Sequence, residues 1–239
     1  FARQTAEDVA ILNGSDPWIR SHARDLRAAT LWFGGGDHAM LRADAAAIRM
    51  RLDGREELYP LAKVHLAGAH NRENMMAAIA AARAVGVAPA AVQEALEAFR
   101  GLPHRLELVR ERDGVRWIDD SKGTNAGAVV MSLAGYERTV ILLAGGIDKG
   151  GDYGVLVEPV RRGVKHAILF GASREMLART LAGVTDLELV GGLAEAVRRA
   201  AALALPGDTV MLSPACASFD MFRDYADRGR QFQALVQAL

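Results

Sequence analysis

The sequence predicts an α/β protein whose second half contains a mostly parallel sheet covered by helices on both faces. From about residue 116 onward, short apolar runs typical of buried strands alternate with stretches typical of helices. Several of these runs end directly in glycine-rich or polar turns, and in parallel sheets ligands bind beyond the carboxyl ends of the strands. We therefore expect a ligand site at that edge of the sheet.

The composition is that of a globular protein with one large domain or two ordinary ones. The 239 residues are 51% hydrophobic and 24% charged. The 29 basic and 29 acidic residues cancel, so no global field favours nucleic acid or an anionic membrane surface. We expect no nucleic-acid partner, and any recognition of anions must be local.

The number of cysteines and the length of the apolar runs exclude several classes of protein. A single cysteine, Cys216, excludes an internal disulfide and a multi-cysteine zinc site, which suits a reducing, cytoplasmic location. No apolar run reaches the roughly 18 residues of a membrane span, so no membrane insertion is expected. No His-Glu-x-x-His pair or carboxylate cluster supports a metal site, and a monomer is expected.

The first hundred residues have the pattern of a mixed domain. Apolar runs predict strands, and an Asp53-Gly54 pair between alternating segments predicts a hairpin. Alanine-rich stretches separated by Gly86 predict two closely packed helices. The expected strands are 9–12, 29–33, 48–52 and an extended stretch at 58–66, and the expected helices are 74–85 and 89–99.

A breaker cluster, Gly101-Leu102-Pro103, divides the chain into domains 1–101 and 102–239. Beyond it the alternation of strand and helix is regular. The expected strands are 116–118, 139–143, 166–170, 187–190 and 209–212, and the expected helices are 125–134, 154–162, 173–181, 193–204 and 219–239.

The most informative turn, residues 119–125, reads Asp-Asp-Ser-Lys-Gly-Thr-Asn and joins a strand to a helix. Free N–H groups and the helix dipole favour anions at such a turn, and Lys122 adds a full positive charge. The pattern indicates a site for phosphate or carboxylate. A solvated lysine at a helix start is the alternative.

Two further strand ends carry polar residues. The loop 145–151, Gly-Gly-Ile-Asp-Lys-Gly-Gly, allows close backbone approach to a ligand, although such loops are common in α/β folds. The turn 213–218, Ser-Pro-Ala-Cys-Ala-Ser, leaves room for a small polar molecule, although its serines could simply cap the last helix. Cys216 is interpreted as a packing residue. If the strands are neighbours, one anionic ligand could be bound by Lys122, Thr124, Lys149 and Ser218.

Two segments near the boundary carry polar residues as well. Taken alone, 68–74 and 101–105 favour a capped helix and an interdomain turn. Arg105 could equally contact a phosphate or a ribose.

Five motifs occur in order: His-Asn-x-x-Asn, Gly-Leu-Pro-His-Arg, Asp-Asp-Ser-Lys-Gly-Thr-Asn, Gly-Gly-x-Asp-Lys-Gly and Ser-Pro-Ala-Cys-Ala-Ser-Phe-Asp. The series resembles the Mur ligases of peptidoglycan synthesis over nearly the whole chain, and the last motif resembles the D-glutamate-adding members. The resemblance implies a UDP-binding domain, a central ATPase domain and a Rossmann-like C-terminal domain. It also implies that ATP phosphorylates the carboxyl of UDP-N-acetylmuramoyl-L-alanine and that the amine of D-glutamate attacks the acyl phosphate.

Roles carried over by motif are implied by the resemblance alone. Residues 1–101 would be the later part of the central ATP-binding domain, and 102–239 the amino-acid-binding domain. Lys122 would be catalytic, touching both phosphate and the incoming amino acid. The implied nucleotide contacts are Asn71, Asn74, His104, Arg105 and Asp120, and the implied D-glutamate contacts are Lys122, Thr124, Lys149, Ser218 and Tyr225, the last through its backbone.

The sequence departs from the family pattern in its first part. It begins at Phe1 and has no Gly-x-x-x-x-Gly-Lys-Ser/Thr phosphate loop. The UDP-binding domain, the Mg²⁺-binding glutamate and the carbamylated lysine of the family would precede Phe1. We therefore expect a fragment that does not ligate alone. Alternatives are another amino-acid ligase of the same superfamily, such as folylpolyglutamate synthase, or a non-catalytic domain that binds a dicarboxylate or nucleotide.

Overall fold

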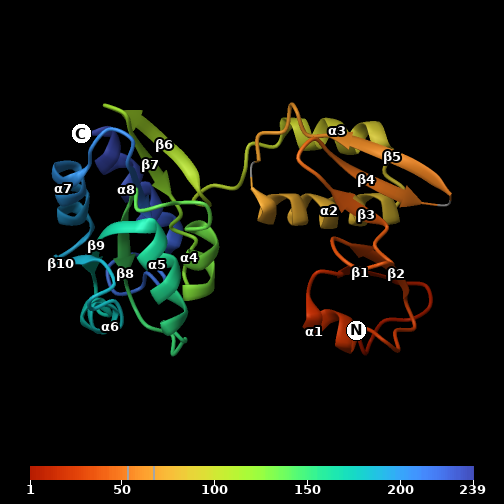
Figure 1. Ribbon diagram of the computed structural model, residues 1–239, viewed down its shortest axis with the longest axis horizontal. Coiled ribbons are helices and arrows are strands. Elements are labelled where there is room, and N and C mark those ends of the chain that lie inside the picture. Colours follow the sequence, from red (N-terminus) through yellow and green to blue (C-terminus); the bar gives the residue numbers. More distant parts are fainter. Residues whose placement is uncertain (53, 67) are drawn as a thin grey trace. The chain divides into compact units, whose positions relative to one another are not determined.

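A computed structural model describes residues 1–52, 54–66 and 68–239. The chain forms two compact units, Phe1–Gly101 and Leu102–Leu239, which are described separately (Figure 1). Within the described ranges, no helix is both long and apolar enough to cross a membrane.

The first unit is a five-stranded mixed sheet in the order β1-β2-β3-β4-β5, with β1, β2 and β3 parallel and the last two pairings antiparallel. Helix α2 packs on the sheet, and Met75, Met76 and Ile79 are buried against strand residues that include Ile48 and Met50. The elements are β1 Val9–Asn13, α1 Pro17–His22, β2 Ala29–Phe33, β3 Leu41–Ala43, β4 Ala47–Leu52, β5 Arg55–Pro60, α2 Ala69–Ala84 and α3 Pro89–Ala98.

The strands expected at 9–12, 29–33 and 48–52 and both helices are present, but the extended stretch expected at 58–66 is strand only as far as Pro60, and β3 was not expected. Two further differences concern the helices. Helix α2 begins at Ala69, not near residue 74, because Gly68 takes the N-cap position in a backbone conformation (φ 98°) that favours glycine. The short helix α1 was not expected, although Asp16 caps it and Pro17 occupies its first position. The predicted hairpin joins β4 to β5, with Leu52 opposite Arg55; Asp53 itself lies outside the described residues.

The second unit is a six-stranded sheet in the order β10-β9-β8-β11-β7-β6, which confirms the expected α/β class with a mostly parallel sheet. Only the pairing of β6 with β7 is antiparallel among these neighbours. The elements are β6 Glu107–Arg112, β7 Val115–Asp119, α4 Ala126–Ser132, β8 Val140–Gly145, the 3-10 turn η1 Gly154–Leu156, α5 Val157–Gly163, β9 Val164–Phe170, α6 Arg174–Thr180, β10 Asp186–Leu189, α7 Leu193–Leu203, β11 Thr209–Leu212 and α8 Tyr225–Gln237.

Helices cover both faces of this sheet, since successive side chains of a strand point to opposite faces. Ile118 packs on the face covered by α4, α5 and α6, and its neighbour Trp117 packs on the face covered by α7 and α8. All six residues of the central strand β8 are buried. A strand covered on both faces reads as a continuous apolar run, which is why this sheet was predictable.

Two predictions for this unit are corrected. Strand β6 was not expected, because it is an edge strand rich in exposed charge; the Asp113-Gly114 turn that joins it to β7 has positive φ at both residues, as a tight hairpin turn requires. Helix α8 begins at Tyr225, not at residue 219. Asp224 caps it with a hydrogen bond from the N–H of Asp227, so neither Ser213 nor Ser218 is its cap.

Candidate active site

The three polar strand ends lie side by side at one edge of the second sheet. Strand β11 lies between β7 and β8, and Leu212 pairs with Asp119 on one side and Leu143 on the other. Because the three strands are parallel and their carboxyl ends are aligned, the turns that follow them emerge from the same edge of the sheet. The strands are therefore neighbours, which is the condition under which one ligand could be bound by residues from all three turns.

The two carboxylates at the end of β7, Asp119 and Asp120, point into the protein rather than into solvent. Asp120 is only 5% exposed, and its Oδ2 accepts hydrogen bonds from Ser132 Oγ (2.7 Å) and Ser213 Oγ (2.6 Å). Its Oδ1 accepts a longer bond of 3.3 Å from the N–H of Leu106. Asp120 thus joins the ends of β7 and β11 to helix α4. Burial raises the pKa of its carboxyl in spite of these bonds.

Replacing this carboxylate should change how stability depends on pH. A raised pKa means that the folded state binds the proton more tightly, so Asp120 makes the free energy of unfolding fall as pH rises from about 4 through the folded-state pKa. Asp120→Asn should remove that decline, by at most about 1.4 kcal/mol per pH unit. This decline can be measured by urea unfolding between pH 4 and 8, with hydrogen exchange of the β8 amides as the readout.

The matched control is Asp186→Asn, which removes the same charge from an exposed strand position. It should leave the pH profile close to that of the wild type. A profile for Asp120→Asn that parallels the wild type at every pH would contradict a raised pKa at this carboxyl.

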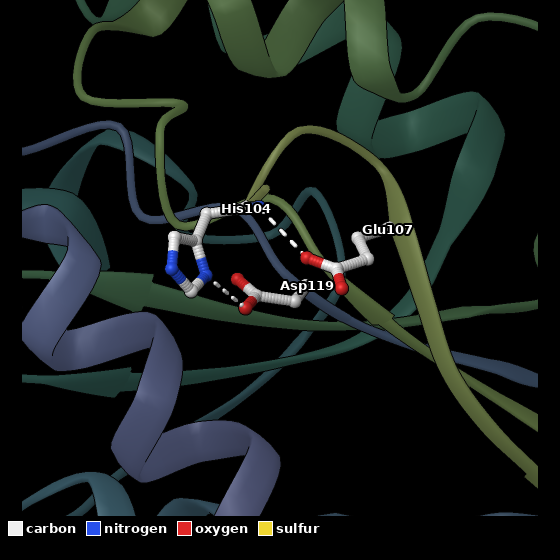
Figure 2. Close-up of side chains that lie close together, drawn as sticks. All are labelled: His104, Glu107 and Asp119. Carbon is white, nitrogen blue, oxygen red and sulfur yellow. Dashed lines mark hydrogen bonds and ion pairs between the residues drawn. The ribbon is translucent and has the colours of Figure 1, made fainter. Parts of the chain in front are cut away.

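His104, Glu107 and Asp119 form a compact cluster behind the turn (Figure 2). His104 Nδ1 lies 2.7 Å from Asp119 Oδ2, and Figure 2 shows the imidazole facing that carboxylate. The Glu107 carboxylate accepts from the backbone N–H of His104 at 2.8 Å. The cluster holds His104 in a left-handed conformation with φ 63°, which non-glycine residues rarely adopt.

Three ligand atoms of this cluster lie within 4.8 Å of one another, the spacing of a metal site. However, the side-chain amide of Gln233 donates to both carboxylates, to Glu107 Oε2 at 3.1 Å and to Asp119 Oδ2 at 2.8 Å. The cluster therefore has its own internal donors, and we interpret it as a hydrogen-bonded support rather than a cation site.

Lys122 is fixed at both ends. Its backbone N–H donates to the carbonyl of His104 at 3.0 Å, and its ammonium Nζ lies 4.0 Å from the centroid of the Tyr225 ring. Among the described residues, no carboxylate lies within ion-pair distance of Lys122. The ammonium is half-buried and not neutralised by any of these residues. That Lys122 binds an anion here stays a prediction.

The other predicted D-glutamate contacts are partly brought together. Lys149 Nζ lies 3.5 Å from Thr124 Oγ1 across two neighbouring turns. Ser218 is buried and follows Ala217, whose backbone forms a two-way bridge with Ile147 in the glycine loop. The loop that carries Lys149 and the turn that carries Ser218 are thus held together by main-chain hydrogen bonds.

The predicted nucleotide contacts fall in both units. His104 and Asp120 are buried and engaged as described, whereas the neighbouring Arg105 is exposed. Asn71 and Asn74 lie inside the first two turns of α2 in the first unit, so neither is its N-cap. That all five contact a nucleotide stays a prediction.

Sequence reasoning did not single out Arg228, a fully buried arginine in α8. Its guanidinium donates to the carbonyls of Ser121 (3.0 Å), Cys216 (3.3 Å) and Gly145 (3.4 Å), and to Ser121 Oγ at 3.0 Å. Each of the three strand-end turns therefore contributes a carbonyl to one cation. Burial lowers the pKa of Arg228 to about 10.

A signal for Arg228 was present in the sequence. Arg228, Phe232 and Val236 recur every four residues and form one stripe of α8, and all three are buried. An arginine on an apolar stripe is a buried cation that needs partners. Cys216, by contrast, behaves as interpreted: it is fully buried, and burial raises the pKa of its thiol.

Known proteins resemble the chain in sequence. A family model described as Mur ligase, glutamate ligase domain, matches residues 104–216. A UDP-N-acetylmuramoylalanine--D-glutamate ligase of Geotalea uraniireducens is 42% identical over 247 residues, covering 100% of this chain and 53% of that protein. The protein of the same name from Myxococcus xanthus is 43% identical over 248 residues, covering 100% of this chain and 54% of that protein. The chain thus spans about half the length of these relatives.

Solved structures share the fold at lower identity. Escherichia coli FolC, in complex with DHPP and ADP, gives a TM-score of 0.69 at 18% identity, covering 96% of this chain and 53% of that chain. The MurF ligase of Thermotoga maritima, in complex with ADP, gives a TM-score of 0.63 at 18% identity, covering 98% and 55%. At these identities the likeness shows the fold alone.

Proposed function

We propose that the chain works as part of an ATP-dependent ligase that adds D-glutamate to UDP-N-acetylmuramoyl-L-alanine. The match of residues 104–216 to the glutamate ligase domain of Mur ligases, and the 42% identity to a ligase of that name, support the proposal. The reaction forms an amide bond and releases ADP and phosphate. The reaction belongs to the synthesis of peptidoglycan precursors, in the cytoplasm, and so supports cell-wall growth, cell shape and division.

One observation supports the proposal above the others: at one edge of the sheet, Lys149 contacts Thr124, which lies in the same strand-end turn as Lys122. A dicarboxylate amino acid needs two cationic or hydrogen-bonding positions, and Lys149 with Thr124 supplies one. Lys122 supplies the second, and its ammonium is not neutralised by a carboxylate in the part of the chain that the structure describes. The chemistry of these side chains fits D-glutamate.

The proposed role of these residues is electrostatic, because phosphoryl and acyl transfer place negative charge on oxygen atoms throughout the reaction. Lys122 would face the phosphate that is transferred and then released. Thr124, Lys149 and Ser218, with the backbone of Tyr225, would hold the carboxylates of D-glutamate so that its amine is aimed at the acyl phosphate. The nucleotide, with Mg²⁺, would be contacted by Asn71, Asn74, His104, Arg105 and Asp120.

Replacing Lys122 tests the proposal. In the enzyme expressed from its whole reading frame, phosphate release should depend on D-glutamate, ATP and UDP-N-acetylmuramoyl-L-alanine together. Lys122→Ala should lower turnover by about 100- to 1000-fold, because it removes a fixed charge at the developing oxyanion. Arg179→Ala removes an exposed cation on α6 and is the matched control, with turnover expected to stay near that of the wild type.

The same assay separates the alternatives. Faster turnover with another amino acid than with D-glutamate would indicate a different ligase of the superfamily. Tight binding of D-glutamate in calorimetry, without phosphate release by the whole enzyme, would indicate a binding domain. Near-normal turnover of Lys122→Ala would refute the role assigned to this lysine.

A further inference from the structure

The ammonium of Lys122 has an aromatic rather than an acidic partner. Its Nζ lies 4.0 Å from the centroid of the Tyr225 ring, within the range of a cation–π interaction. Both side chains are half-buried, so water screens the contact only partly. A carboxylate in the place of the ring would hold the lysine equally well but would cancel its charge.

Tyr225 is held through both its backbone and its ring. Tyr225 is the first residue of α8, and its carbonyl accepts a hydrogen bond of 2.7 Å from Ser121 Oγ. That hydroxyl in turn accepts from Arg228 Nε at 3.0 Å. On another side, the His104 ring contacts the Tyr225 ring edge-on, with centroids 6.3 Å apart. Tyr225 is therefore anchored through its backbone, and its half-buried ring contacts His104.

The backbone of Lys122 is held by one of the same residues. Its N–H donates to the carbonyl of His104, the residue whose imidazole is paired with Asp119 and packs on Tyr225. The backbone and the ammonium of Lys122 are thus held by two residues, His104 and Tyr225, that contact each other. A long, flexible side chain loses most of its rotamer freedom in such a setting before any ligand arrives.

We propose that the Tyr225 ring is a positioning residue that holds the Lys122 ammonium in place while leaving its charge available to an anionic group of the substrate. The inference rests on the proposed function for the identity of that anion, and it assigns the ring a role apart from any backbone contact with the amino acid. An aromatic face orients a cation electrostatically without neutralising it, which suits a lysine that must stabilise transient negative charge.

A direct test of the contact does not depend on the function. The chain has four lysines, so their side-chain signals can be resolved by NMR of the chain labelled at lysine, with Lys122→Arg to assign one of them. The Hε protons of Lys122 should be shifted upfield by the ring current, and the shift should vanish in Tyr225→Leu. A Lys122 signal at the position of an unstacked lysine in the wild type would overturn the proposal.

A graded series tests the role in turnover. Tyr225→Leu should lower the turnover number roughly five- to thirty-fold, the range of a partly desolvated cation–π contact, while Tyr225→Phe should rescue most of that loss. Phenylalanines with increasing fluorination at position 225 keep nearly the same shape but weaken the π face, so turnover should fall in that order. A merely structural role predicts no such order.

The outcomes separate this inference from the proposed function. Absence of D-glutamate-dependent phosphate release in the wild type would count against the function. Equal loss in Tyr225→Phe and Tyr225→Leu would assign the effect to the phenol hydroxyl and overturn the role of the ring. Turnover that is insensitive to fluorination, with normal activity in the wild type, would likewise overturn it.

Discussion

Arg228→Met should lower the free energy of unfolding of the second unit by about 3 kcal/mol or more, and it should abolish turnover by releasing the three strand-end turns. Methionine fills a similar volume, so the change removes hydrogen bonds with little cavity. The carbonyls of Ser121, Gly145 and Cys216 would remain buried without this donor, at a cost of about 1–3 kcal/mol each.

Desolvation acts in the opposite direction, since a buried guanidinium is itself unfavourable, as the lowered pKa of Arg228 shows. Replacing a buried charge can be neutral when its partners are replaced as well. Here the partners are main-chain carbonyls, which no side-chain substitution removes. We therefore expect the loss of hydrogen bonds to dominate.

Hydrogen exchange of the buried β8 amides, measured against urea, reports the stability of this unit. The matched control is Arg230→Met on the same helix, where the side chain is 55% exposed and its nearest carboxylate oxygen lies 3.8 Å away. Only a small change is expected there. Equal exchange rates in Arg228→Met and the wild type would show that the three carbonyls find other donors.

Gly146→Ala should destabilise the second unit by about 3 kcal/mol and displace the loop that carries Lys149. Gly146 has φ 136°, a conformation that side chains rarely adopt, which costs on the order of 1–3 kcal/mol. An added Cβ would also collide with the carbonyl oxygen of Ala217, and backbone cannot swing aside as a flexible side chain can. The collision falls on the bridge between Ile147 and Ala217.

Gly150→Ala is the matched control in the same loop. Gly150 also has positive φ (74°), but no heavy atom lies within 4 Å of an added Cβ. Gly150→Ala should therefore lower the free energy of unfolding only by the cost of a side chain in this backbone conformation, about 1–2 kcal/mol. Thermal unfolding and D-glutamate-dependent turnover of both variants measure the difference. Equal effects of the two substitutions would refute the steric contribution of the Ala217 carbonyl.

The elements that local pattern could predict are those buried on both faces. Strands such as β8 and β11 are continuous apolar runs ended by glycine or serine, so their position followed from composition alone. Strand β6 has exposed, charged residues on an open edge, and its only signal was the Asp113-Gly114 turn. The start of α8 was misplaced because Asp224, not an earlier serine, caps the helix.

The site shows the same division. Lys122, Thr124 and Lys149 were identifiable because they follow strands directly, and turns at that edge face a ligand. The partners of Arg228 and Gln233 were not identifiable. Arg228 donates to Ser121 and Gly145, and Gln233 to Glu107 and Asp119, all more than 80 positions away, so a local window shows at most that Arg228 lies on an apolar stripe.

The sequence by itself therefore determined the class of fold, the resemblance to a family, and the polar turns that follow the strands, because these depend on short-range periodicity and on contiguous motifs. Only the tertiary structure decided what each side chain in those turns faces. Asp119 and Asp120 turn inward to histidine and serines, and Lys122 lies on the ring of Tyr225. The physical reason is that burial and hydrogen-bond pairing are set by segments that meet only when the sheet and α8 have folded together.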